Sequence, residues 1–189
     1  NTHQAFQQHL RCRSAGFRGT KLISDASSGT FDGSAVARET SAPGVLRAAA
    51  TAWADRSALE IPSRRWNYAQ LWADVVDAAR AFHAAGVRAG DRVAIWAPNQ
   101  PEWILAALAA QCLGAALVPL NTRLKGREAA DILRRSRVRV LVTVEPFLGA
   151  DYPALLSGEE LPDLQQVVRC AVPDGQATTT PAPTPSNLP

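Results

Sequence analysis

The sequence predicts an α/β fold, a partial doubly wound parallel sheet with flanking helices. Within residues 43–170, short apolar runs alternate at regular intervals with longer segments whose apolar positions recur at helical spacing. One run, Val93–Ala97, is continuously apolar, which is typical of a strand buried on both faces of a parallel sheet. A chain of 189 residues with 47% hydrophobic and 20% charged residues is long enough for one domain with a substantial core.

The predicted elements follow one another in a regular order. A first helix covers Val45–Trp53, and two extended pieces, Ala58–Ile61 and Arg65–Asn67, meet at Pro62-Ser63 like the strands of a hairpin. The next helix carries one apolar stripe, made of Tyr68, Leu71, Trp72, Val75, Ala79 and Phe82. Beyond it the sequence predicts strands at Val93–Ala97, Ala116–Leu120, Val138–Val144 and Gln166–Cys170, a helix ending at Cys112, and a helix over Arg127–Arg135.

Three helix ends have recognisable signals. Asn67 is placed to cap the long amphipathic helix, with Gln70 completing a capping box three residues later, and Gly86 stands where a left-handed residue ends it. Asn99 as cap, followed by Pro101 and Glu102, predicts the start of the helix that ends at Cys112. That helix is apolar nearly all round, so we expect it to be buried.

The two ends of the chain lack this patterning. Residues 1–42, rich in Ser, Gly, Thr and Gln, are predicted to be a disordered extension or linker, and the Pro/Thr-rich residues 171–189 a disordered tail. The chain starts at Asn1 and contains no methionine, which favours a fragment of a longer protein.

Composition argues against several classes of function. The net charge of +3 is modest, and the densest basic run, Arg134 to Arg139, has no interleaved aromatic residues, so nucleic acid is not the expected partner. The cysteines at 12, 112 and 170 form no CxxC pair, which leaves a zinc or redox motif unsupported and favours a reducing, cytoplasmic location. Residues 103–120 are apolar except for Gln111, but Gly114 and Pro119 interrupt them, so no transmembrane segment is predicted.

No catalytic, cofactor-binding or metal-binding residue is predicted. The predicted strands end at Pro98-Asn99, Asn121–Arg123 and Val144-Glu145, and no glycine-rich phosphate loop follows any of them. The segment Ser27-Ser28-Gly29-Thr30 is similar to the start of such a loop but lies before the patterned region. His83, like His3 and His9, lies away from the strand ends, and Asp74 and Asp77 are expected on the solvated face of their helix.

Four segments nevertheless point to a family. Residues Asp91–Asn99, followed by Glu102-Trp103, resemble a segment of the adenylate-forming, or AMP-binding, enzymes. Leu113–Asn121, with the sequence Leu-Gly-Ala-Ala-Leu-Val-Pro-Leu-Asn, is similar to the second core motif of that superfamily, and Trp66–Leu71 to the first, Leu-Thr-Tyr-x-Glu-Leu. Phe147–Tyr152 resembles a segment of a bacterial acyl-CoA ligase subgroup. The likeness spans residues 43–170 and is greatest to bacterial fatty-acid and carboxylic-acid CoA ligases.

This resemblance implies the N-terminal subdomain of the adenylate-forming fold, and a two-step reaction for the whole enzyme. A carboxylic acid and ATP give an acyl-adenylate and pyrophosphate, and CoA then gives the thioester and AMP. ATP, Mg²⁺ and CoA would be the cofactors of that enzyme, with none bound tightly by this chain. Asn121 stands where peptide-synthetase adenylation domains usually have Asp, which favours a CoA ligase.

The family's catalytic groups have no counterpart in this sequence. They are a Ser/Thr/Gly loop ending in Lys, an acidic magnesium ligand, a ribose-binding Tyr/Phe-x-Thr-Gly-Asp motif and a lysine of a mobile C-terminal domain. Neither Lys21 nor Lys125 lies in a matching context. We therefore expect the chain to be inactive alone and to act with the remainder of a ligase. Two alternatives stay open: a non-catalytic α/β module that binds a partner or a CoA-like ligand at its strand ends, and a flavodoxin-like nucleotide binder.

Overall fold

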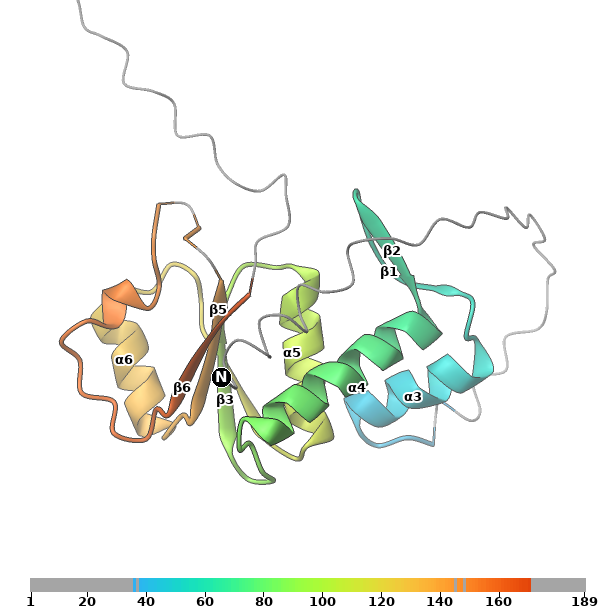
Figure 1. Ribbon diagram of the computed structural model, residues 1–189, viewed down its shortest axis with the longest axis horizontal. Coiled ribbons are helices and arrows are strands. Elements are labelled where there is room, and N and C mark those ends of the chain that lie inside the picture. The colour runs from blue at the N-terminus through green and yellow to red at the C-terminus, as the bar shows by residue number, and fades with distance from the viewer. Residues whose placement is uncertain (1–35, 37, 145, 148, 171–189) are drawn as a thin grey trace, which may run out of the picture.

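The computed structural model describes residues 36, 38–144, 146–147 and 149–170, and it contains a parallel sheet with helices on both faces (Figure 1). The strands are β3 (Arg92–Trp96), β4 (Ala116–Pro119), β5 (Val140–Val144) and β6 (Gln166–Cys170), in the spatial order β4-β3-β5-β6. All three strand pairings are parallel. The predicted α/β class is confirmed.

The order of the strands places helices on opposite faces of the sheet. From β3 the chain passes through α5 (Pro101–Cys112) to β4 at one edge, and then returns through α6 (Gly126–Arg135) past β3 to β5. Because such crossovers are right-handed, α5 and α6 lie on opposite faces, as Figure 1 shows. The short 3₁₀ helix η1 (Ala154–Leu156), which follows β5, packs on α6. The chain therefore leaves β3 and β5 toward opposite faces, so the topological switch point lies between these two strands.

A smaller helical part with a hairpin packs on the α5 side of the sheet. It consists of α3 (Ala42–Ala52), the antiparallel strands β1 (Ser57–Ile61) and β2 (Arg64–Asn67), and α4 (Tyr68–Ala84). α4 contacts α3, the hairpin and α5 (Figure 1).

Two hydrophobic cores meet at α5. The larger core lies around the sheet and takes Ala106, Ala107, Ala109 and Ala110 from α5. The smaller core lies under the hairpin and takes Leu105 from the same helix. Because α5 is covered from both sides, its sequence has no polar face. The prediction that this helix is largely buried is confirmed.

The helix-end signals are confirmed at α4 and wrong by one residue at α5. Asn67 Oδ1 accepts from the Gln70 N–H at 2.8 Å, Gln70 Oε1 accepts from the Asn67 N–H at 3.1 Å, and Gly86 has a φ of +91°. The residue that caps α5 is Gln100, not Asn99, and its side chain makes no capping hydrogen bond. Pro101 occupies the first helical position, the one that proline favours, so the residue directly before it becomes the cap.

The capping box gives a first testable prediction. Asn67→Ala should lower the free energy of unfolding by about 1 kcal/mol, because the N–H of Gln70 loses its side-chain acceptor. Urea denaturation of the parent and the variant measures this difference. Asn99→Ala is the matched control, since this exposed asparagine caps no helix, and it should change stability by less than about 0.5 kcal/mol. Equal losses for the two variants would contradict the assigned cap.

Candidate functional site

The carboxyl ends of β3, β4 and β5 are where an open parallel sheet binds its ligands. The structure brings the predicted strand-end residues to this edge but leaves them in different environments. Asn99, Asn121 and Arg123 are exposed, whereas Pro98 and Thr122 are half-buried. Asn121 Oδ1 accepts from the Arg123 N–H at 2.9 Å, so this asparagine shapes its own turn. Val144 is buried, and Glu145 lies outside the described residues.

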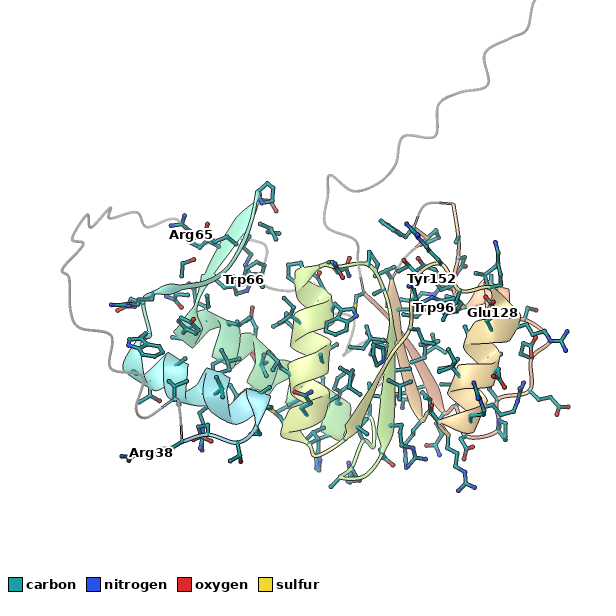
Figure 2. All side chains as sticks on the ribbon, turned by 180° about the vertical axis from the view of Figure 1, so that it is seen from behind. Arg38, Arg65, Trp66, Trp96, Glu128 and Tyr152 are labelled. Atoms are coloured by element: carbon teal, nitrogen blue, oxygen red, sulfur yellow. The ribbon has the colours of Figure 1, made fainter. Side chains whose placement is uncertain are left out.

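Two aromatic side chains stack on each other beside the switch point between β3 and β5. Trp96, the last residue of β3, is fully buried, and its ring stacks on that of Tyr152 with centroids 4.7 Å apart and planes 30° apart. Tyr152 comes from the segment after β5 and is 2% exposed. Figure 2 labels both rings beside the sheet.

Hydrogen bonds tie this pair to all three strand ends. Trp96 Nε1 donates to the backbone oxygen of Asn121 at 3.0 Å, which links β3 to the residues after β4. Thr143 Oγ1 donates to the backbone oxygen of Trp96 at 3.1 Å, which links β5 to β3. Burial raises the pKa of the Tyr152 hydroxyl, and a hydrogen bond with Thr122 partly opposes that effect, so Tyr152 stays neutral at physiological pH.

The sequence at this edge bears on what the edge can bind. A nucleotide in a doubly wound fold lies in the crevice at the switch point, and its phosphates lie against a glycine-rich turn that this sequence lacks. The residues at these strand ends therefore do not fit the phosphates of ATP or CoA. The missing turn argues against a flavodoxin-like nucleotide binder.

Beside this edge, the first turn of α5 contains polar groups that are buried without partners. The amide oxygen and nitrogen of Gln100 have no hydrogen-bond partner, and the residue is 8% exposed. Glu102 Oε2 is also buried without a partner. Burial raises the pKa of the Glu102 carboxyl, with smaller opposing effects from a backbone hydrogen bond and the charge of Arg64.

Arg64 belongs to a polar cluster that the sequence did not predict. Its Nη2 donates to Asp74 Oδ2 at 3.1 Å, and its guanidinium carbon lies 3.9 Å from the centroid of the Trp66 ring. Trp66 Nε1 donates to the same Asp74 oxygen at 2.9 Å. The expectation that Asp74 lies on a solvated face is wrong, because the hairpin folds over it and leaves its side chain 15% exposed. The cluster fixes β2 to α4 and has no free group for chemistry.

The raised pKa of Glu102 predicts how stability depends on pH. Because its pKa is raised, the Glu102 carboxyl stays protonated in the folded state at pH values above its ordinary pKa of 4.5. The contribution of Glu102 to stability is therefore complete below pH 4.5 and is lost as the pH rises through the folded pKa. Glu102→Gln removes the burial cost of the charge, so we expect a higher melting temperature at pH 7 and a gain that shrinks towards pH 4.

Glu60→Gln is the matched contrast for this experiment. A hydrogen bond from Ser57 is the main cause that lowers the pKa of Glu60, so losing this carboxylate should lower stability at pH 7. Melting temperatures of the parent, Glu102→Gln and Glu60→Gln, measured between pH 4 and pH 7, test both expectations. A gain for Glu102→Gln that does not depend on pH would contradict the burial argument.

The other residues considered in the sequence take structural or surface positions. His83 is exposed in the last turn of α4, and Asp77 pairs with Arg80 at 3.0 Å. Cys112 is half-buried and its thiol pKa is raised by burial, while Cys170 is buried. Lys21, His3, His9, Cys12 and the segment Ser27–Thr30 lie outside the described residues.

The basic run that begins in the last turn of α6 is largely paired with acidic groups. Arg134 pairs with Glu159 at 3.3 Å, Arg135 with Asp131 at 2.8 Å, and Arg139 with Asp91 at 3.7 Å. Arg134 and Arg135 end the helix, where positive charges suit its dipole. The run forms ion pairs within the chain, as expected of helix-end and strand-flanking residues.

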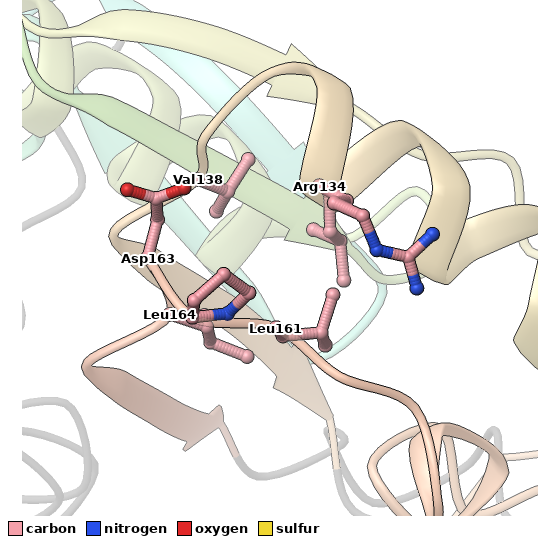
Figure 3. Close-up of a pocket in the computed structure, with 7 residues that line it drawn as sticks. Arg134, Val138, Leu161, Asp163 and Leu164 are labelled. Atoms are coloured by element: carbon pink, nitrogen blue, oxygen red, sulfur yellow. The ribbon is translucent and has the colours of Figure 1, made fainter.

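A shallow depression lies between the end of α6 and the loop before β6, near the amino ends of the strands (Figure 3). It has about 150 Å³ of empty space and is lined by Leu133, Arg134, Val138, Leu161, Pro162, Asp163 and Leu164. Small-molecule sites are clefts or cavities of roughly 300–1,000 Å³ that enclose most of the ligand, and this open depression encloses no such space. Its position beside Val138, before β5 begins, also places it away from the carboxyl ends of the strands.

The described ranges lack two kinds of feature. No three His, Cys, Asp or Glu side chains in that part of the chain are grouped so that they could hold a metal ion. None of its helices is long and apolar enough to cross a membrane.

Comparison with solved structures identifies the fold more closely. The anthranilate CoA ligase AuaEII, solved with anthranoyl-AMP, matches with a TM-score of 0.61 and 30% identity, over 67% of this chain and 24% of that one. The N-terminal domain of FACL13 from Mycobacterium tuberculosis matches with a TM-score of 0.61 and 32% identity, over 66% of this chain and 32% of that one. The architecture described above is that of the N-terminal subdomain of adenylate-forming enzymes.

Sequence comparison agrees. A 7a-methyl-1,5-dioxo-octahydro-1H-inden-4-yl propanoyl:CoA ligase of Mycobacterium tuberculosis is 48% identical over 118 residues, which are 62% of this chain and 23% of the relative. The ligase of the same description from Rhodococcus jostii is 40% identical over 139 residues, 73% of this chain and 27% of the relative. The chain thus spans about a quarter of the length of these relatives. The family model for "AMP-binding enzyme" matches residues 46–187, and the chain belongs to this family.

Proposed function

We propose that this chain is the N-terminal part of an ATP-dependent acyl-CoA ligase, and that it has no ligase activity alone. The whole enzyme would join a free carboxylic acid to CoA, with ATP converted to AMP and pyrophosphate. The observation that carries the proposal is the match to CoA ligases, over 62% and 73% of this chain and about a quarter of each relative.

The geometry supports a structural role for these residues within such an enzyme. At the strand ends that would bind a nucleotide in an independent domain, Trp96 and Tyr152 stack on each other, and no glycine-rich turn follows a strand. The described residues supply no phosphate loop, and their acidic side chains do not converge on a possible magnesium site. ATP, Mg²⁺ and CoA would therefore be bound by the remainder of the enzyme, and the chemistry would take place there.

Three further points belong to the same proposal. Residues 43–170 form the N-terminal part of the AMP-binding domain, residues 1–42 an extension, and residues 171–189 a tail. The enzyme acts in the cytoplasm, which the odd number and wide spacing of the cysteines favour. Its partners are the remainder of the ligase and a small carboxylic acid.

The test is the activity of a complete ligase that contains this chain. Incubated with free carboxylic acids, ATP and CoA, it should consume the CoA thiol and release AMP, with no product when either ATP or the acid is left out. A panel of short, long and ring-containing acids covers the unknown substrate. Loading of an amino acid onto a carrier protein, without thioester formation from free CoA, would overturn the assignment and make the enzyme a peptide-synthetase relative.

A further inference from the structure

α3 packs on α4 and α5 through few side chains, and it lies away from the parallel sheet (Figure 1). The one large apolar side chain that α3 buries is Leu46, a member of the smaller core. Its polar side chains bond locally: Arg47 pairs with Glu39 at 3.2 Å, and Thr51 Oγ1 donates to the carbonyl of Arg47 at 3.1 Å. The other buried positions of the helix carry small residues or proline, namely Pro43, Gly44 and Ala49.

The elements under α3 are anchored independently of it. α4 places Phe82 in the larger core, and α5 places four alanines there. The hairpin is fixed to α4 through Asp74, which accepts from both Arg64 and Trp66. α3 pairs with no strand and precedes the whole sheet in the chain, so its removal breaks no contact within the larger core.

We propose that α3 is a strap over the smaller core, which detaches from α4 and α5 as one unit while the parallel sheet stays folded. Proteins open locally in cooperative units, and those with few buried apolar contacts open at the lowest free energy. Detachment uncovers the sides of α4 and α5 that Leu71, Val75 and Leu105 form in the smaller core.

A detached α3 does not keep its helical structure. It has 11 residues, and isolated helices shorter than about 12–15 residues are marginal in water. Gly44 in its first turn weakens it further. Opening therefore removes the helical hydrogen bonds of α3 together, and its amide hydrogens exchange with solvent through one common opening.

Hydrogen exchange of the 189-residue chain, resolved by residue, tests the proposal with two variants. Ile95→Val weakens the larger core, where Ile95 is completely buried in β3. It should speed exchange of the β3 and β5 amides about 2–10-fold and leave the α3 amides unchanged, because Ile95 is packed alike in the closed and the opened forms. Leu46→Ala, the matched variant, should speed exchange of both sets at least about tenfold, because it weakens the closed form alone.

Urea below the unfolding transition gives a second readout, on the parent chain. Opening of α3 exposes little surface, so exchange of its amides should depend less steeply on urea than exchange of the β3 amides, which requires global unfolding. The amides of residues 48–52 should also share one opening free energy. Equal acceleration of the α3 and β3 amides by Ile95→Val, equally steep urea dependence of the two, or opening free energies that differ along residues 48–52 would overturn the proposal.

Discussion

Trp96→Ala is expected to lower the free energy of unfolding by about 3–5 kcal/mol, the usual cost of truncating a fully buried tryptophan. The variant loses the stacked contact with Tyr152 and the hydrogen bond from Nε1 to the backbone oxygen of Asn121. It also opens a cavity at the switch point, where the loops after three strands meet. The free energy of unfolding of a domain is about 5–15 kcal/mol, so this single substitution removes a large part of it.

Urea denaturation followed by circular dichroism measures the loss. Trp103→Ala is the matched control, because Trp103 is a half-buried tryptophan on α5, and its truncation should cost clearly less. Trp96→Phe keeps a ring against Tyr152 and should be intermediate. If Trp96→Ala and Trp103→Ala cost the same, the buried contact of Trp96 with Tyr152 does not stabilise the chain as described.

Gly126→Ala is expected to destabilise the chain by about 1–3 kcal/mol, the cost of an overpacked site. Gly126 begins α6, and a methyl group built on it would collide with the carbonyl of Leu155 in η1, its carbon 2.7 Å from the carbonyl carbon. The obstacle is backbone, so it cannot be relieved by a change of rotamer. Alanine gains about 0.5–1 kcal/mol over glycine inside a helix, which offsets only part of this cost.

Thermal and urea unfolding of Gly126→Ala should therefore show a less stable protein. Arg127→Ala changes the next, exposed residue of the same helix and should stay within about 0.5 kcal/mol of the parent. A Gly126→Ala variant more stable than the parent would show that η1 moves freely and that the close contact with α6 is not required.

Features set by neighbouring residues were predictable from the sequence. Apolar runs placed all four strands of the parallel sheet, and the box of Asn67 and Gln70 was found because its two partners lie three residues apart. The mistake at α5 was also local. Asn99 is the better capping residue, but Pro101 fixes the first helical position and makes Gln100 the cap.

Features that depend on distant residues were not predictable. Asp74 was expected in solvent because its helical position is off the apolar stripe, and only the folded hairpin brings Arg64 and Trp66 to it. Trp96 was recognised as part of a buried strand, but its partner Tyr152 follows β5, and no spacing rule connects the two. A bulky aromatic residue at the carboxyl end of a strand was the one signal in the sequence for this buried contact.

The most direct test of the chain's proposed place in a ligase is carboxylate-dependent exchange between ATP and pyrophosphate. Formation of an acyl-adenylate needs cations or backbone N–H groups around the phosphates. The motifs that supply these groups in the family have no counterpart in the sequence. The measurement uses the 189-residue chain at high concentration, labelled pyrophosphate, and carboxylic acids of several lengths. We expect exchange at the rate of a control without protein for every acid. Exchange that rises above that rate when an acid is added, and that disappears on heat denaturation of the chain, would contradict the assignment of catalysis to the remainder of the enzyme.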